Sequence, residues 1–304
     1  RLLKRCQSEA RRSFGNGDLY AEQLIENARH IEVQIIGDHF GNVTHLWERE
    51  CSIQRRYQKL VEIAPAPFIA ESLRDEIIES AVKLANSVGY SNIGTFEFLT
   101  YQSNQAEYDS FVFIEGNPRL QVEHTVTEEV TGVDIVQSQI RLAEGATLSE
   151  IGLDVNNPPM VRGYAIQNRI NCETISNSGQ IKPSTGKITR YSAPRGPGIR
   201  TDSFVYSGYE TTMAFDSLIA KLICHSNSSN FLDAVNRSKQ ALGEFDIDGV
   251  ETNLEFHLKI MSHPEFICGK INTHFLDRNL SELIPNEPPS RRDIGISQPT
   301  AVEK

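Results

Sequence analysis

The sequence TFEFL at residues 95–99 and the sequence FVFIEGNPRLQVEH at residues 111–124 contain the pattern that decides the fold. Residues 95–99 and the first part of the second segment read as β-strands, and a polar loop joins them. If the strands form an antiparallel hairpin about the middle of that loop, Glu97 lies opposite Glu115, and Asn117 shares their face. Two adjacent carboxylates repel each other, so this pair is expected to bind a cation or to have a raised pKa. Together with an amide oxygen they form a ligand set suited to Mg²⁺.

The same parity is compatible with two glutamates on a solvated polar sheet face, and without further signals that simpler interpretation is favoured. The residues after Pro118 favour a functional site instead. Arg119, Gln121 and Glu123 share one face if that stretch is extended. An arginine beside a carboxylate, close to a possible metal pair, indicates an anion site that has its own base.

A second candidate is the basic stretch CSIQRRYQKL at residues 51–60. Arg55, Arg56 and Lys59 concentrate positive charge there in an otherwise acidic chain. A solvated basic turn is the simpler interpretation of this stretch taken alone.

The pattern outside these segments predicts an α+β protein with mixed helices and strands. HIEVQII at 30–36 alternates in the manner of a strand, within a strand-rich region that starts at Leu19, and a hairpin turn follows at 37–42. Helical spacing and turn signals predict the remaining elements: helices at 2–14, 71–88, 124–145 and 230–243, short strands between the last two helices, a domain boundary at 156–160, and a linker or tail after 284.

Composition excludes several classes of protein. The 304 residues carry a formal charge of -10, which argues against a nucleic-acid-binding protein, and no apolar run approaches the length of a membrane helix. Five scattered cysteines without a CxxC pair indicate a reducing compartment and argue against a zinc site. The chain begins with Arg1, in what reads as the middle of a helix, so we expect an incomplete chain.

Several long stretches, in consecutive order, resemble the biotin carboxylase family of ATP-grasp ligases. Residues 19–67, TFEFL and residues 113–145 resemble its ATP-grasp core. GYAIQNRINCE, STGKITRYSAPRGPGIRTD and YETTMAFDSLIAKLI resemble its C-terminal domain. The resemblance implies three regions: part of an ATP-grasp core at 1–155, a biotin carboxylase C-terminal domain at 156–283, and a linker or tail at 284–304.

The resemblance also implies roles for individual residues. The hinge segment at adenine corresponds to Glu22, Gln23, Leu24 and Ile25, and the ribose contacts correspond to His30 and Gln54. The ligands of Mg²⁺ or Mn²⁺ correspond to Glu97, Glu115 and Asn117, and the bicarbonate contacts correspond to Lys59, Arg119, Gln121 and the Val122 backbone. The general base corresponds to Glu123, and the contact with the biotin oxygen corresponds to Arg169. From the residues alone, His30 is equally compatible with a structural histidine, and Arg169 with a surface arginine.

The implied activity is ATP-dependent carboxylation of biotin by bicarbonate, through carboxyphosphate. The implied partners are a biotin carrier domain, a carboxyltransferase component and a second copy of the chain, in the cytosol or the mitochondrion. The final acceptor is set by the carboxyltransferase and is not encoded in these residues. A carbamoyl-phosphate synthetase half and a non-catalytic or oligomerisation module are the alternatives.

The sequence departs from the family in three places. Tyr57 stands where members often have histidine, and the loop between Glu97 and Glu115 is longer than in compact members, which suggests a partner contact. No glycine-rich loop precedes Glu22, so we expect the lid that grips ATP to be missing and this chain alone to be a weak or inactive catalyst.

Overall fold

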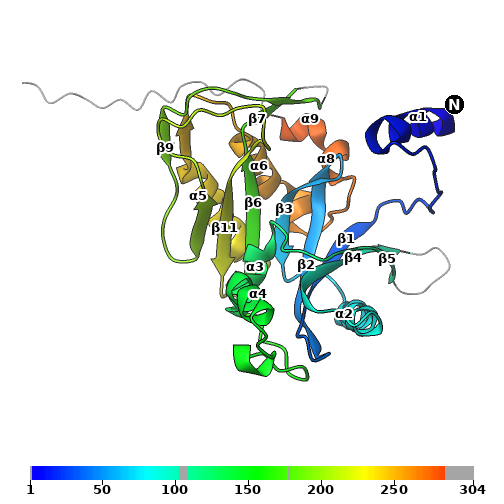
Figure 1. Ribbon diagram of the computed structural model, residues 1–304. Coiled ribbons are helices and arrows are strands. Elements are labelled where there is room, and N and C mark those ends of the chain that lie inside the picture. The colour runs from blue at the N-terminus through cyan, green and yellow to red at the C-terminus, as the bar shows by residue number, and fades with distance from the viewer. Residues whose placement is uncertain (1, 103–108, 177–178, 285–304) are drawn as a thin grey trace, which may run out of the picture.

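An antiparallel sheet organises the protein (Figure 1). The computed structural model describes residues 2–102, 109–176 and 179–284, and within them the main sheet has eight strands in the order β10-β11-β6-β3-β2-β1-β4-β5. Two small sheets, β12-β9 and β7-β8, lie outside it. The strands are β1 Arg29–Gly37, β2 Val43–Arg55, β3 Gln58–Ala64, β4 Asn92–Gln102, β5 Asp109–Asn117, β6 Tyr164–Asn171, β7 Glu173–Ile175, β8 Ile181–Pro183, β9 Arg190–Ser192, β10 Ile199–Ser203, β11 Leu218–Ser226 and β12 Asp246–Asp248.

Helices cover both faces of this sheet, which confirms the α+β fold. The helices are α1 Leu2–Phe14, α2 Glu71–Ser87, α3 His124–Thr131, α4 Ile135–Ala143, the short 3₁₀ helix η1 Ser149–Ile151, α5 Phe231–Glu244, α6 Leu254–Ser262, α7 Pro264–Ile267, α8 Phe275–Arg278 and α9 Leu280–Leu283. Helix α1 buries none of its side chains and lies apart from the sheet in Figure 1.

The alternation of side chains along the strands assigns the helices to opposite faces. Ile31, Val33 and Ile35 of β1 belong to the same apolar cluster as residues of α2, whereas Glu32 between them faces Arg49 on the other side. The same alternation on β6 directs Gln167 toward α3 and Asn168 toward α5. The face under α3 and α4 is therefore the one that carries buried polar groups.

The sheet continues through the region in which the sequence predicts a domain boundary. Val61 and Ile63 of β3 pair with Asn168 and Ile166 of β6, so strands from both predicted domains are hydrogen-bonded neighbours. The largest apolar cluster also includes residues from β2 and β3 together with β6, β11, α5 and α6. The division at 155/156 stays a prediction, as does the tail after 284, which lies outside the described residues.

Two sequence-based predictions are corrected by the structure. Residues 19–28 contain no strand, and the first strand begins at Arg29. The stretch 124–145 forms two helices, since Gly132 adopts a left-handed conformation (φ 73°) that ends α3. Asp134 then caps the start of α4 by accepting a hydrogen bond from the Gln137 N–H at 2.7 Å.

Candidate functional site

The predicted antiparallel hairpin is present, and it places Glu97 and Glu115 opposite each other, as the alternation of side chains along the strands predicts. Strands β4 and β5 pair antiparallel with Glu97 opposite Glu115 and Thr95 opposite Asn117. The register shifts by one residue beyond Glu97, where Ile114 has no partner and forms a bulge. Residues 103–108 of the connecting loop lie outside the described residues.

The Asn117 side chain links the two carboxylates. Its Nδ2 lies 2.8 Å from Glu97 Oε1 and 2.9 Å from Glu115 Oε1. Glu97 is buried, whereas Glu115 is exposed, so the pair reaches from the interior to solvent. Gln121 Nε2 donates to Glu97 Oε1 at 2.8 Å, and Gln121 Oε1 is a buried oxygen without a hydrogen-bond partner among the described residues.

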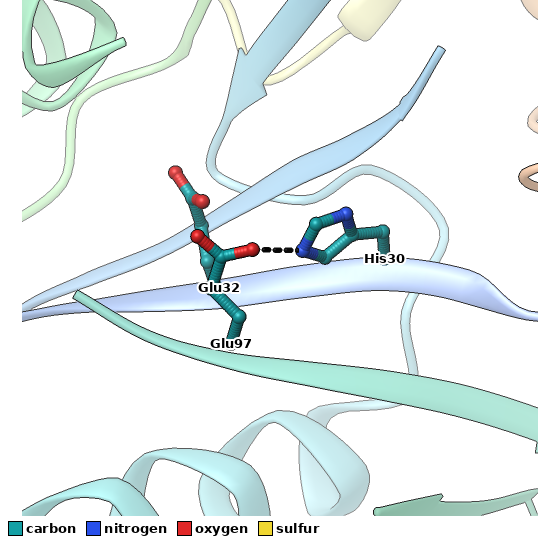
Figure 2. Close-up of side chains that lie close together, drawn as sticks. All are labelled: His30, Glu32 and Glu97. Atoms are coloured by element: carbon teal, nitrogen blue, oxygen red, sulfur yellow. Dashed lines mark hydrogen bonds and ion pairs between the residues drawn. The ribbon is translucent and has the colours of Figure 1, made fainter. Parts of the chain in front are cut away.

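Two further residues converge on Glu97 from the neighbouring strand β1 (Figure 2). His30 Nε2 lies 2.6 Å from Glu97 Oε2, and Glu32 pairs directly across from Glu97 in the sheet. One ligand atom from each of these three buried side chains lies within 4.8 Å of the others. His30 thus has a carboxylate partner inside the site.

Lys59 connects this group to Glu123. Its Nζ lies 2.5 Å from Glu32 Oε2, 3.3 Å from Glu97 Oε1 and 2.6 Å from Glu123 Oε1. Lys59 reaches this place because β2 and β3 form a tight hairpin, in which Gln54 pairs with Lys59. The exposed Tyr57 lies in the turn of that hairpin and has a left-handed backbone conformation (φ 65°).

Arg169 holds the other oxygen of Glu123. Its Nη2 lies 3.0 Å from Glu123 Oε2, and its Nε lies 2.6 Å from Glu62 Oε1. The carboxylate of Glu123 is thus held between an ammonium and a guanidinium in a buried position. Because β3 and β6 are adjacent, Lys59 and Arg169 lie on one side of the sheet although 110 positions separate them in sequence.

Buried charge is unevenly balanced in this site. The carboxylates of Glu32, Glu62, Glu97 and Glu123 face the cations of Lys59, Arg49 and Arg169. With Glu62 ionised and His30 neutral, four negative groups face three positive groups, and the exposed Glu115 adds a further negative charge. A divalent cation would correct this imbalance, and the carboxylate and amide oxygens at Glu97, Glu115 and Asn117 are suitable donors for Mg²⁺.

The neighbouring groups decide the ionisation of Glu32 and Glu97. Burial favours the protonated form of Glu32, but Arg49 and Lys59 outweigh it and lower its pKa to about 2. Burial has the same effect on Glu97, whereas the hydrogen bond from His30 and the charge of Lys59 lower its pKa to about 2. Burial disfavours the Lys59 ammonium, yet the neighbouring carboxylates raise its pKa. Lys59 therefore acts as a fixed cation.

These shifts predict a loss of stability in acid. The pKa values of Glu32 and Glu97 in the folded protein lie below the unfolded value of about 4.3. Their contribution to stability is therefore present above pH ~4.3 and is lost as the pH falls toward 2. We expect urea unfolding between pH 7 and pH 2.5 to show this fall, with a shallower slope for Glu97→Gln. Glu79→Gln, on the exposed face of α2, is the control; equal slopes for all three proteins would contradict the assignment.

The structure leaves some predicted residues away from this group. Glu22, Gln23 and Leu24 are exposed and Ile25 is half-buried in the segment before β1, and no hydrogen bond among the described residues joins them to the cluster. Arg119 is exposed and contacts the Leu120 carbonyl at 3.3 Å, not Glu123. The expected pairing of Arg119 with a nearby acid is thus not seen, and Gln54 is half-buried beside Lys59.

The sequence analysis missed three residues of the cluster, Glu32, Arg49 and Glu62. All three side chains are fully buried. Arg49 Nε lies 2.5 Å from Glu32 Oε1, and burial raises the pKa of Glu62, which contacts Arg169. Glu32 lies on the polar side of the alternating strand HIEVQII, which was the available signal. Nothing local distinguishes Glu62 or Arg49 from ordinary polar strand residues. The functional roles of the cluster residues remain predictions.

Comparison with known proteins identifies two family models in succession. Residues 1–151 match the "Carbamoyl-phosphate synthase L chain, ATP binding domain" and residues 167–278 match the "Biotin carboxylase C-terminal domain". Pyruvate carboxylase of Aspergillus niger is 47% identical over 276 residues, which are 90% of this chain and 22% of that protein. Biotin carboxylase 1 of Bacillus subtilis is 44% identical over 275 residues, which are 90% of this chain and 58% of that protein.

Solved structures agree with this result. The biotin carboxylase domain of a thermophilic 2-oxoglutarate carboxylase, bound to bicarbonate, has a TM-score of 0.82 and 42% identity, and the match covers 92% of this chain and 60% of that one. Biotin carboxylase from Campylobacter jejuni, in a complex with β,γ-ATP, has a TM-score of 0.82 and 42% identity over 91% of this chain and 58% of that one. This chain therefore belongs to the biotin carboxylase family of ATP-grasp proteins, and it spans less than two thirds of the length of these relatives.

Proposed function

We propose that this chain supplies the metal, bicarbonate and biotin side of an active site for the ATP-dependent carboxylation of biotin. The observation that carries the proposal is the position of Glu123. Its two oxygens contact Lys59 and Arg169, and Lys59 also contacts Glu97 of the proposed metal site. A base, two cations and a metal-ligand group therefore meet on one side of the sheet, as a reaction between two anions requires.

In the proposed reaction, bicarbonate attacks the γ-phosphate of ATP to form carboxyphosphate and ADP. Glu123 accepts the bicarbonate proton, while Lys59 and the Gln121 side chain orient the anion. Carboxyphosphate then breaks into CO₂ and phosphate beside biotin. The released phosphate accepts the proton of the ureido nitrogen of biotin, and this nitrogen attacks CO₂ to form the new N–C bond. Arg169 stabilises the negative charge that develops on the biotin oxygen. Arg119 and the Val122 N–H complete the bicarbonate contacts.

Glu97, Glu115 and Asn117 fit a bound Mg²⁺ or Mn²⁺, because they offer two carboxylates and one amide within hydrogen-bonding distance of each other. The ion would supply charge neutralisation at the phosphates of ATP. We assign adenine and ribose contacts to Glu22–Ile25, His30 and Gln54, as the family resemblance implies.

The proposed partners are a biotin carrier domain, a carboxyltransferase component and a second copy of this chain. One related structure is described as a dimer of biotin carboxylase domains, with MgADP, ADP and bicarbonate. No helix in the part of the chain that the structure describes is long and apolar enough to cross a membrane. One relative, 44% identical over 289 residues, is the human protein named "Pyruvate carboxylase, mitochondrial", and the mitochondrion and the cytosol are the two compartments that we propose.

The metal site and the reaction can be tested separately. We expect Glu97→Gln and Glu115→Gln to weaken Mn²⁺ binding roughly tenfold or more, measured by electron paramagnetic resonance, because each removes a charged ligand. Glu79→Gln, which exchanges an exposed glutamate of α2, is the matched control. Unchanged Mn²⁺ affinity in both variants would refute the metal assignment.

Phosphate release from ATP distinguishes the alternatives. In the proposed function it depends on bicarbonate and rises when free biotin is added. A carbamoyl-phosphate synthetase half would respond to ammonium instead, and the match of residues 167–278 to a biotin carboxylase C-terminal domain disfavours it. Phosphate release that responds to neither addition, in a protein that also fails to bind bicarbonate, would support a non-catalytic module.

A further inference from the structure

The loop from Arg119 to Glu123 connects β5 to α3 and contains a backbone N–H that is available to a ligand. Within residues 2–102, 109–176 and 179–284, no acceptor bonds the Val122 N–H. Both carbonyl groups that flank this N–H are held by side chains. Backbone atoms that are fixed in this way can receive an anion without first being ordered, which reduces the cost of binding.

His124 holds the first carbonyl. Its ring Nδ1 lies 2.7 Å from the Gln121 carbonyl oxygen, and Nδ1 is the donor because that oxygen can only accept. The Gln121 carbonyl and the Val122 N–H belong to the same planar peptide unit and point in opposite directions. The contact from His124 therefore fixes the direction of the Val122 N–H.

Lys221 holds the second carbonyl. From the distant strand β11, its Nζ lies 3.2 Å from the Val122 carbonyl oxygen and 3.3 Å from Asp202 Oδ2. The Val122 carbonyl belongs to the peptide unit that leads into Glu123, the proposed base. Lys221 thus fixes the peptide on the other side of Val122.

Arg200 joins these two supports in one ionic network. Its guanidinium contacts Asp202 at 2.9 Å and Glu128 of α3 at 2.8 Å. Glu128 Oε2 in turn lies 3.8 Å from His124 Nε2. The partners of Lys221 and His124 are therefore connected through Arg200.

We propose that His124 and Lys221 are positioning residues that direct the Val122 N–H toward bound bicarbonate. The inference rests on the proposed function, because it takes Val122 as a bicarbonate contact. If these contacts only stabilised the first turn of α3, their loss would lower the stability of the protein but would not selectively lower its affinity for bicarbonate.

The test uses the full chain and follows the Val122 amide resonance by ¹H–¹⁵N NMR, with sodium bicarbonate as the probe. In His124→Leu the bicarbonate affinity is expected to fall about fivefold to tenfold, and amide exchange at Val122 to accelerate by a similar factor, because one orienting hydrogen bond is lost. His124→Asn keeps an N–H donor near the position of Nδ1 and restores both values to within about twofold. At Lys221, Lys221→Met removes the donor and Lys221→Arg keeps one, and the same two results are expected.

His225→Leu is the matched control, since His225 also contacts a backbone carbonyl, that of Arg162, outside this loop. Wild-type affinity and exchange in His124→Leu and Lys221→Met overturn the inference, as does an equal loss in His225→Leu. If bicarbonate leaves the wild-type Val122 resonance unchanged, the bicarbonate role fails and the inference fails with it. If bicarbonate shifts the resonance equally in wild type and in the variants, the proposed function stands and only the positioning role fails.

Discussion

In a protein that joins this chain to an ATP-gripping lid, Glu123→Gln is expected to lower bicarbonate-dependent phosphate release from ATP by at least roughly 10²-fold, because it removes the proposed general base without changing the shape of the side chain. The fold should persist. Lys59 keeps its contact with Glu32, and Arg169 keeps its contact with Glu62. The amide oxygen of the new glutamine can still accept one hydrogen bond. The loss should therefore appear in turnover, with an unchanged circular dichroism spectrum.

The control for this variant is Glu144→Gln, which changes an exposed glutamate at the end of α4. Bicarbonate binding, measured by ¹³C NMR on the same proteins, serves as a second readout that does not require turnover. Phosphate release by Glu123→Gln within about threefold of the same lid-containing protein without the substitution would exclude Glu123 as the base.

Arg49→Met is expected to cost about 3–5 kcal/mol of unfolding free energy, the largest effect on stability that the structure predicts. The Arg49 side chain is fully buried and has four acceptors, on three different elements. It contacts Glu32 at 2.5 Å, Gln34 at 2.8 Å, Thr127 at 3.0 Å and Thr95 at 3.2 Å. Methionine fills much of the same volume but leaves the Glu32 carboxylate buried with Lys59 as its remaining cation.

Urea unfolding at pH 7 measures this effect, and a double-mutant cycle with Glu32→Gln isolates the interaction free energy between Arg49 and Glu32. The double variant should lose less stability than the sum of the two single variants, because it contains neither unpaired charge. Arg5→Met, which affects an exposed pair on α1, should leave the unfolding midpoint unchanged. Additive losses at Arg49 and Glu32 would show that the two residues do not stabilise each other.

The site was predictable from the sequence where it depends on one hairpin. The opposition of Glu97 and Glu115, and the shared face of Asn117, follow from the two-residue period of strands and from the position of the loop centre. The structure confirms that opposition, although a bulge at Ile114 adjusts the register. The broken helix after Thr131 was missed because apolar spacing continues across Gly132, and only the turn conformation of that glycine ends α3.

The prediction that Arg119, Gln121 and Glu123 share one face of an extended segment was only partly correct. An extended strand would have aligned the three side chains, but the segment turns into the start of α3. Gln121 and Glu123 are consequently buried toward Glu97 and Lys59, whereas Arg119 points outward and is exposed. A strand period cannot describe a segment that leaves the sheet.

By itself, the sequence determined the two faces of β1, the β4–β5 hairpin, the longer helices and the family resemblance, since each depends on residues close together along the chain. Only the tertiary structure decided which strands are neighbours. The pairing of β3 with β6 brings Lys59 and Glu62 beside Arg169, and α3 then places Glu123 between them. Those contacts join residues 46 to 107 positions apart. The burial energy of the whole sheet fixes them, because no local preference extends over such a distance.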